Sequence, residues 1–334
     1  MTKQSKLQFI AYDQADAIPN IVVDGAANAA TQITLSHWPK SGTPHALKAN
    51  SSTEIVFRYL AEPAFQVEAT AITNNHFDED GLVGLYTLLQ PEAAKSDRDL
   101  LVGIAHAGDY KTYSDRRAAR IAFTISAFAD SATSPLDVNI FALPYAEKAA
   151  ALYRELLPRL GTMLRDTDKF RRYWEPEDQR LSDSETRLSQ GAIQIDERQE
   201  LDLAVVTILE GEGGDEADAA YLGCHRMAIH NATARNRLLI RRGRRYVFAY
   251  RYESWVQMVT RRPLPRVDLT PLAEALSAEE PGAAAWTFDG VAEITPRMTL
   301  AGAQESAVSP DDLVDRVSAY LATATPAWDP YDPE

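Results

Sequence analysis

The sequence has a single cysteine, Cys224, in 334 residues. One thiol cannot form an internal disulfide, and it cannot supply the thiolate clusters of structural zinc sites. Any metal site must therefore be built from oxygen and imidazole ligands. Because structural disulfides belong to oxidising compartments, the scarcity of cysteine is typical of a cytoplasmic protein.

Long apolar runs are also missing. No stretch of about 18 apolar residues occurs, so no membrane-spanning helix is expected. Residues 1–6 lead directly into the apolar run that begins at Leu7, without the long apolar region and small-residue cleavage site of a secretory signal. We therefore expect a cytoplasmic protein that does not bind membranes.

Positive charge is scarce as well. The 34 lysines and arginines stand against 48 aspartates and glutamates, which gives a formal net charge of −14. Proteins that bind long nucleic acids usually carry an excess of cations, because they displace the counterions of many phosphates. The charge balance therefore argues against long nucleic acid as a partner. A small anionic ligand held through a metal ion is compatible with it, and the sequence leaves a homodimer open.

Four familiar catalytic signatures are absent from the sequence. They are the Gly-x-Ser-x-Gly nucleophile elbow, the Walker-type phosphate loop, the Gly-x-Gly-x-x-Gly dinucleotide motif and the His-Glu-x-x-His zinc motif. These absences disfavour serine hydrolases, P-loop nucleotidases, Rossmann dehydrogenases and zincins.

What the sequence does contain is a regular alternation in its first third. Short apolar runs typical of buried strands alternate with amphipathic segments typical of helices, and the chain is long enough for about two domains. This alternation predicts an α/β fold with a mostly parallel sheet flanked by helices. The expected strands are residues 9–12, 20–24, 32–35, 67–73 and 100–105, and the expected helices begin at 51 and 82.

The middle of the chain is expected to be helical. Residues 116–130 and 145–174 have helical patterns, the second with a kink at Pro158. The segment 175–190 is polar and charged, and we expect it to be the domain boundary.

Beyond this boundary the pattern changes to paired β-type runs. Residues 192–196 are expected to pair with 201–206, and residues 237–240 with 246–250, as hairpins. We therefore expect a metal-site domain at 1–175, a smaller C-terminal α+β domain rich in hairpins at 191–325, and a non-helical tail at 326–334.

The segment from Asn74 to Gly81 carries the strongest chemical signal. His76, Asp78 and Asp80 occupy alternate positions directly after an expected strand, so an extended backbone would place their side chains on one side. Open α/β sheets bind ligands at the carboxyl ends of their strands, and the following helix directs its positive end there. One imidazole and two carboxylates suit Mn, Mg, Fe or Zn. The alternative is an acidic turn that caps the helix, with His76 as a packing residue.

This segment resembles the first motif of the DHH phosphoesterases, with a strand before it and a helix after it. Val22-Val23-Asp24-Gly25 looks like the strand-plus-Asp motif of the same superfamily, and the segment from Ile33 to Pro39 looks like the one that bears its Asp-His-His. In that superfamily, carboxylates and imidazoles hold two divalent cations, and a metal-bound hydroxide attacks phosphorus. As a whole, the sequence also resembles an uncharacterised bacterial protein family.

The resemblance implies a set of site residues. His76, Asp78 and Asp80 would be metal ligands, Asp24 would bridge or complete a two-metal site, and Asp109 is the best candidate for the remaining motif aspartate. His37 would be a ligand or a contact to a phosphate oxygen, with a purely structural role as the alternative. The implied metal is manganese or magnesium.

The sequence departs from the DHH pattern at two levels. Ser36-His37-Trp38 stands where the superfamily has Asp-His-His, so one carboxylate and one imidazole are missing. The motifs also occur in a different order, as a circular permutation would produce. Residues 260–285 are similar to the substrate-binding domain that accompanies many of these enzymes, which implies that Arg261 or Arg262 contacts the substrate.

Two functions follow as hypotheses. The first is a divalent-metal-dependent phosphoesterase-like hydrolase of a small phosphorylated molecule or short nucleotide, with Asp78, Asp80 and His37 as its catalytic residues. The second is a catalytically degenerate protein on the same scaffold that binds or senses a nucleotide or metal, which Ser36 and Trp38 favour. A structural protein with an acidic turn and no site is the third reading.

Overall fold

The computed structural model describes residues 7–209 and 216–332. Contacts within the chain divide it into two units, the first made of residues 1–179 with 258–260 and the second of 180–257 with 261–334. Both units combine helices with a sheet, so the expected mixed α/β fold is confirmed.

The first unit contains a four-stranded sheet in which every neighbouring pair is parallel. This confirms the parallel sheet expected from the alternation of the sequence. The order across the sheet is β1 (Gln8–Phe9), β4 (Ala71–Thr73), β2 (Asn20–Val23) and β3 (Thr31–Leu35).

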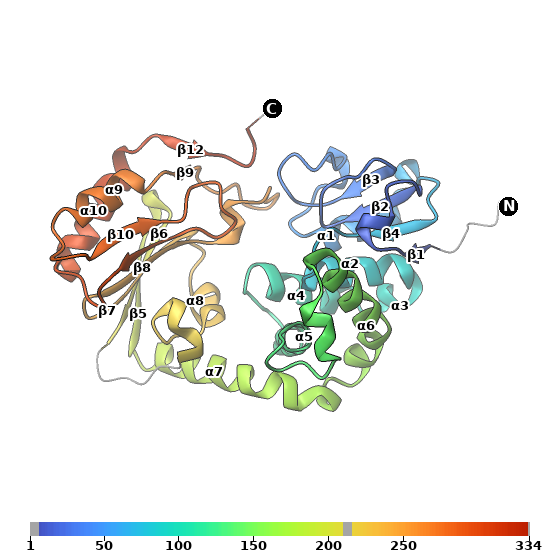
Figure 1. Ribbon diagram of the computed structural model, residues 1–334, viewed down its shortest axis with the longest axis horizontal. Coiled ribbons are helices and arrows are strands. Elements are labelled where there is room, and N and C mark those ends of the chain that lie inside the picture. The colour runs from blue at the N-terminus through green and yellow to red at the C-terminus, as the bar shows by residue number, and fades with distance from the viewer. Residues whose placement is uncertain (1–6, 210–215, 333–334) are drawn as a thin grey trace. The chain divides into compact units, whose positions relative to one another are not determined.

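The helices of the first unit gather on one side of this sheet (Figure 1). Helix α1 begins where expected, because Ser51 and Glu54 form a capping box that satisfies the first backbone N–H groups. The helices are α1 (Ser52–Ala61), α2 (Glu79–Leu89), α3 (Pro91–Ser96), α4 (Arg98–Asp109), α5 (Arg116–Ala129) and α6 (Tyr145–Arg165).

One expected strand is a helix. Residues 100–105 were expected to form a strand, but they lie inside α4. Leu101, Ile104, Ala105 and Gly108 are buried at helical spacing, and α4 packs between α2 and α5. A short apolar run is compatible with either element, and its neighbours decide between them. The strand expected at 67–73 is also shorter, since only Ala71–Thr73 pairs with the sheet.

The expected polar boundary is also helical. The segment expected as one helix at 145–174 ends at Arg165, and after a short turn α7 (Arg171–Ser189) runs through the whole of 175–189. Trp174, Asp178 and Leu181 form a buried stripe three to four residues apart, so this polar segment has one packed face. The division between the units falls after Gln179, within this helix.

Short 3-10 helices connect many of these elements. They are Tyr12–Gln14, His45–Leu47, Pro63–Phe65, Val138–Ala142, Thr167–Phe170, Gln199–Leu201, Glu216–Tyr221 and Tyr252–Ser254.

The second unit is built on a six-stranded mixed sheet. Both expected hairpins are confirmed, since β5 pairs with β6 and β7 with β8 in antiparallel register, while β6 and β7 are parallel and joined through α8 (Arg226–Ala232). The order is β10 (Ala285–Phe288), β11 (Arg297–Ala301), β8 (Arg245–Tyr250), β7 (Arg237–Arg242), β6 (Leu203–Ile208) and β5 (Ile193–Arg198).

Both faces of this sheet are covered. On β6, Leu203 and Val205 pack with α9 (Thr270–Ser277) and α10 (Pro310–Thr323), while Ala204 and Val206 face the core that contains Ile229 of α8. Alternate residues of a strand point to opposite faces, which explains why these strands read as continuous apolar runs in the sequence.

The expected non-helical tail docks on the second unit. Its residues Pro326–Trp328 form β12, which pairs antiparallel with β9 (Arg266–Val267), and Trp328 stacks on Trp255 at 6.5 Å between ring centroids. Its last two residues, 333–334, lie outside the described residues. Within residues 7–209 and 216–332, no helix combines the length and the apolar character needed to cross a membrane.

Candidate metal centre

The ends of three neighbouring strands bring the predicted site residues together. Strand β2 lies between β4 and β3, and the register pairs Val22 with Thr73 and Val23 with Leu35. The three strands therefore end at the same level of the sheet. Asp24 comes directly after the end of β2, His37 after the end of β3, and the segment that contains His76 after the end of β4. Because all three strands are parallel, these residues meet at the carboxyl edge of the sheet.

Two groups of three ligand atoms form at this edge. Asp24, His76 and Asp78 make the first group, and Asp24, His37 and Asp80 make the second. Within each group the ligand atoms all lie within 4.8 Å of one another. Asp24 belongs to both groups, so the two candidate positions share one carboxylate.

Asp24 is buried, and its backbone is in the left-handed region at a φ of 51°. Such a conformation is uncommon outside glycine, although aspartate adopts it more readily than most residues. Its Oδ1 accepts a hydrogen bond from the Ser52 hydroxyl at 2.7 Å. Its Oδ2 lies 3.3 Å from Nε2 of His76, and no residue in the described ranges donates a well-directed hydrogen bond to it.

The imidazole of His76 lies between two carboxylates. Its Nε2 is 2.8 Å from Asp78 Oδ2 and 3.3 Å from Asp24 Oδ2, while its ring stacks on Trp38 with 4.9 Å between centroids. Burial alone would lower the pKa of His76, but the charges and hydrogen bonds of Asp78 and Asp24 raise the pKa to about 11. The metal-free cluster therefore holds a proton on His76, at the atoms where a cation would bind.

Asp78 has two roles at the start of α2. Its Oδ1 accepts a hydrogen bond from the backbone N–H of Gly81 at 2.8 Å, which makes it the N-cap of the helix. Its Oδ2 contacts His76 instead. A Cβ at Gly81 would lie 2.3 Å from Asn74 Nδ2 and 2.5 Å from the hydroxyl of Tyr153, so the close packing at this position requires glycine. The capping and ligand readings of Asp78 are thus compatible.

His37 is held in an orientation that suits a ligand. Its Nδ1 is 2.6 Å from the backbone carbonyl of Asn50 and 3.0 Å from the hydroxyl of Tyr110. A carbonyl can only accept, so Nδ1 carries the proton and Nε2 keeps its lone pair. Nε2 lies 3.5 Å from both Asp24 Oδ1 and Asp109 Oδ2, inside the acidic cluster.

Asp80 is anchored to the first turn of α1. Its two carboxylate oxygens accept hydrogen bonds from the backbone N–H groups of Ser52, at 2.7 Å, and Thr53, at 2.8 Å. The positive end of the helix therefore offsets part of its charge. Each oxygen retains a second lone pair, so Asp80 can still bind a cation. Among the four carboxylates of the cluster, Asp80 needs a bound cation least, because both of its oxygens already accept hydrogen bonds.

Asp109 lies at the end of α4, so the expectation that it follows a strand is wrong. Its carboxylate nevertheless reaches the cluster, where Oδ2 is 3.5 Å from His37 Nε2. Burial first, and then the charges of Asp80, Asp78 and Asp24, raise the pKa of Asp109 well above its usual value. No hydrogen bond reaches its Oδ2 from the described part of the chain.

The donor set fits a divalent cation. Four carboxylates and two imidazoles converge, and two buried carboxylate oxygens, Asp24 Oδ2 and Asp109 Oδ2, lack a hydrogen-bond donor among residues 7–209 and 216–332. Buried carboxylates that crowd together repel one another, and a cation would offset the part of this repulsion that the protonated His76 does not. Oxygen and imidazole ligands together suit manganese. They suit magnesium less well, because magnesium prefers oxygen ligands to imidazole.

Sequence reasoning missed the residues that orient His37. Tyr110 donates its hydroxyl hydrogen bond to Asn50 O and contacts the His37 ring nitrogen, yet neither Tyr110 nor Asn50 stands in a recognisable motif. His106, in the last turn of α4, lies 3.4 Å from Glu54 and belongs to neither group of ligand atoms.

Ser36 supplies no ligand to this cluster. Its backbone N–H and hydroxyl bind within the loop that follows β3, to Thr43 and to the N–H of Trp38.

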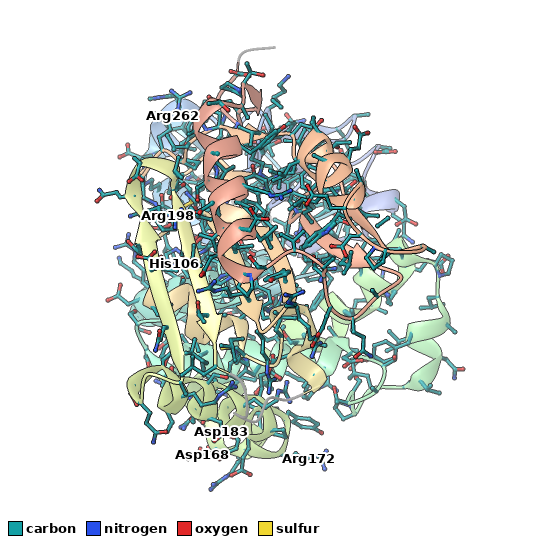
Figure 2. All side chains as sticks on the ribbon, turned by 90° about the vertical axis from the view of Figure 1, so that its left-hand side faces the viewer. His106, Asp168, Arg172, Asp183, Arg198 and Arg262 are labelled. Carbon is teal, nitrogen blue, oxygen red and sulfur yellow. The ribbon has the colours of Figure 1, made fainter. Side chains whose placement is uncertain are left out.

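Arg261 and Arg262 belong to the second unit. Arg261 donates to the Ala234 carbonyl and to Asn236, and Arg262 forms an ion pair with Asp329 at 2.7 Å. Figure 2 labels Arg262, whose side chain is 62% exposed. Their contact with a substrate stays a prediction.

The comparisons with known proteins give one match. Neither the curated proteins nor the solved structures include a chain that matches this one. A family described as "Family of unknown function (DUF6687)" matches residues 5–332, which is nearly the whole chain. The protein is a member of this family.

Proposed function

We propose that the protein is a divalent-metal-dependent phosphoesterase-like hydrolase that acts on a small phosphorylated molecule or a short nucleotide. The observation that carries the proposal is the shared position of Asp24 between two three-ligand groups at the carboxyl edge of a parallel sheet. Paired metal positions are typical of enzymes that cleave phosphate esters. The resemblance of residues 22–25 and 76–81 to DHH motifs supports the same chemistry.

Each ligand would have a defined part. Asp24, His76 and Asp78 would hold one cation, and Asp24, His37 and Asp80 the other, with Asp109 beside the second. When bound, manganese or magnesium would supply Lewis acidity toward the phosphate and toward an attacking water.

The protein groups around the ligands prepare this chemistry. The Asn50 carbonyl fixes the tautomer of His37, and the N-terminus of α1 fixes the carboxylate of Asp80. Buried surroundings limit the access of water and strengthen the electrostatic interactions inside the cluster. These groups therefore hold the ligands in place before a substrate arrives.

Metal content and turnover test the proposal together. The purified full chain is loaded with Mn²⁺, its metal content is measured by mass spectrometry, and hydrolysis of p-nitrophenyl phosphate, bis(p-nitrophenyl) phosphate and dinucleotides is followed. We expect Mn²⁺-dependent turnover that Asp78→Asn abolishes, although asparagine preserves the N-cap of α2. Unchanged metal content in His76→Ala and Asp78→Asn would defeat the metal site itself.

A catalytically degenerate nucleotide- or metal-binding protein is the second candidate. It is favoured by the hydroxyl of Ser36, which replaces a carboxylate, and by the ring of Trp38, which covers His76. Thermal stabilisation by Mn²⁺ and a nucleotide without turnover of any phosphate ester would support this candidate over the hydrolase.

A further inference from the structure

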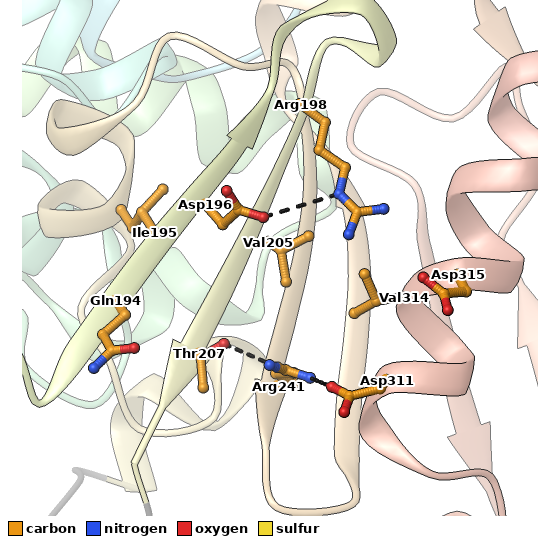
Figure 3. Close-up of a pocket in the computed structure, with 10 residues that line it drawn as sticks. All are labelled: Gln194, Ile195, Asp196, Arg198, Val205, Thr207, Arg241, Asp311, Val314 and Asp315. Atoms are coloured by element: carbon orange, nitrogen blue, oxygen red, sulfur yellow. Dashed lines mark hydrogen bonds and ion pairs between the residues drawn. The ribbon is translucent and has the colours of Figure 1, made fainter.

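A groove of about 370 Å³ lies on the second unit, beside α10. Strands β5, β6 and β7 form its floor and one wall, and α10 forms the other wall (Figure 3). Its volume falls within the range of small-molecule sites. None of the residues that line it belongs to the candidate metal centre.

The strand pleat explains the chemistry of this groove. Gln194, Asp196 and Arg198 alternate along the edge strand β5 and point to the face that α10 covers in part. Val205 and Val314 lie at the base, both nearly buried. The groove thus has an apolar base and a charged rim.

Two arginines flank the apolar base. Arg198 contacts the Ser318 hydroxyl and lies 3.9 Å from Asp196, and Arg241 donates to Thr207 at 2.8 Å and to Asp311 at 3.2 Å. The side chains are only 28% and 21% exposed, yet Nη2 of each guanidinium has no hydrogen-bond partner within the described ranges. Covered guanidinium groups with unused donors suit a carboxylate.

The acidic residues of the rim are placed differently. The side chains of Asp196 and Asp311 are 75% and 95% exposed, and Asp315 also lies on the rim of the groove. Exposed ion pairs are weak, so these aspartates do not use up the charge of the two arginines. Three carboxylates nevertheless oppose the binding of a plain anion, and two guanidinium groups oppose the binding of a plain cation.

We infer that this groove binds the zwitterion of a free aliphatic amino acid. The α-carboxylate would meet Arg198 or Arg241, the α-ammonium would meet a carboxylate of the rim, and the aliphatic side chain would cover Val205 and Val314. A ligand that carries both charges can pair with the arginines and with the aspartates of the rim. A plain anion or a plain cation can pair with only one of these two sets. This site is independent of the proposed hydrolase activity.

Calorimetric titration of the full chain with L-leucine, L-valine and L-isoleucine tests the inference. We expect saturable binding of at least one of them. N-acetyl-L-leucine and L-leucinamide, each lacking one charge, should bind about tenfold more weakly or worse, which is the loss expected for one charged hydrogen bond. These comparisons need no protein variant, so they stand even if a variant folds poorly.

Variants locate the site. At least one of Arg198→Gln and Arg241→Gln, the variant that removes the arginine bound to the α-carboxylate, should weaken binding about tenfold or more. Arg235→Gln is the matched control. Arg235 is 18% exposed but does not line the groove, and it is ion-paired with Glu197, which alternates with Asp196 and Arg198 along β5. Absence of binding up to about 10 mM amino acid, on the millimolar scale of the weakest specific sites, would overturn the inference. So would equal binding of N-acetyl-L-leucine, or binding that both groove variants retain.

Discussion

Replacing Asp24 by asparagine gives the sharpest test of the metal centre, because this residue is shared by both ligand groups. In the metal-free protein, Asp24 attracts the protonated His76 at 3.3 Å, an interaction of about 5 kcal/mol at an effective dielectric constant of about 20. It also repels Asp78 and Asp80, whose ligand atoms lie within 4.8 Å, by at least about 3.5 kcal/mol each. The repulsion, about 7 kcal/mol in total, exceeds the attraction. Asp24→Asn should therefore leave the metal-free protein as stable as the wild type or slightly more stable.

The same substitution should remove the response to metal. For the wild type, Mn²⁺ at about 100 times its dissociation constant adds about 2.7 kcal/mol to the free energy of unfolding. For a unit of this size, that corresponds to a rise of about 5–10 °C in Tm. Asp24→Asn weakens both metal positions at once, so its Tm should barely respond at the same Mn²⁺ concentration.

Thermal unfolding with and without Mn²⁺, followed by circular dichroism, measures both quantities. Asp115→Asn is the matched control, since Asp115 caps α5 outside the cluster and asparagine caps equally well. It should keep the full metal response. A metal response in Asp24→Asn equal to that of the wild type would refute the shared ligand. A metal-free Asp24→Asn that unfolds many degrees earlier would show that Asp24 serves the fold instead.

Three further predictions concern groups around the cluster and away from it. Tyr110→Phe removes a contact that orients His37, so it should weaken Mn²⁺ binding about 10- to 100-fold, as measured by calorimetric titration, with little change in the Tm of the metal-free protein. An unchanged Mn²⁺ affinity would contradict this role of Tyr110. The pKa of His76 is about 11 without metal, so Mn²⁺ binding should release a proton from His76 and become tighter as the pH rises. Calorimetry in buffers of different ionisation enthalpy detects the released proton. A binding heat that is the same in all of these buffers would rule out the release. Burial tends to raise the pKa of Asp178, but hydrogen bonds from two arginines lower it overall, so its stabilising effect is present above the unfolded pKa and lost as pH falls through the folded one. Denaturant titrations should therefore show wild type more stable than Asp178→Asn at pH 7, with a gap that closes in acid; a gap independent of pH would be evidence against the ion pairs.

Much of the local structure was accessible from the sequence. The hairpins at β5–β6 and β7–β8, the start of α1 at its capping box, and the strand before His76 follow from alternation and turn chemistry, which act over a few residues. The prediction that His76 and Asp78 share a site also rests on local spacing, and the structure places them 2.8 Å apart.

Only the tertiary structure decided how distant residues meet. The run at 100–105 became a helix because α2 and α5 pack against it, and this helix delivers Asp109 and Tyr110 to His37. The strand order likewise made Asp24 common to two ligand groups. Sequence patterns carry information over only one or two turns of a helix or a few residues of a strand. A cluster of groups from four separate segments depends on which helices and strands become neighbours, and the packing of the whole core decides which of them do.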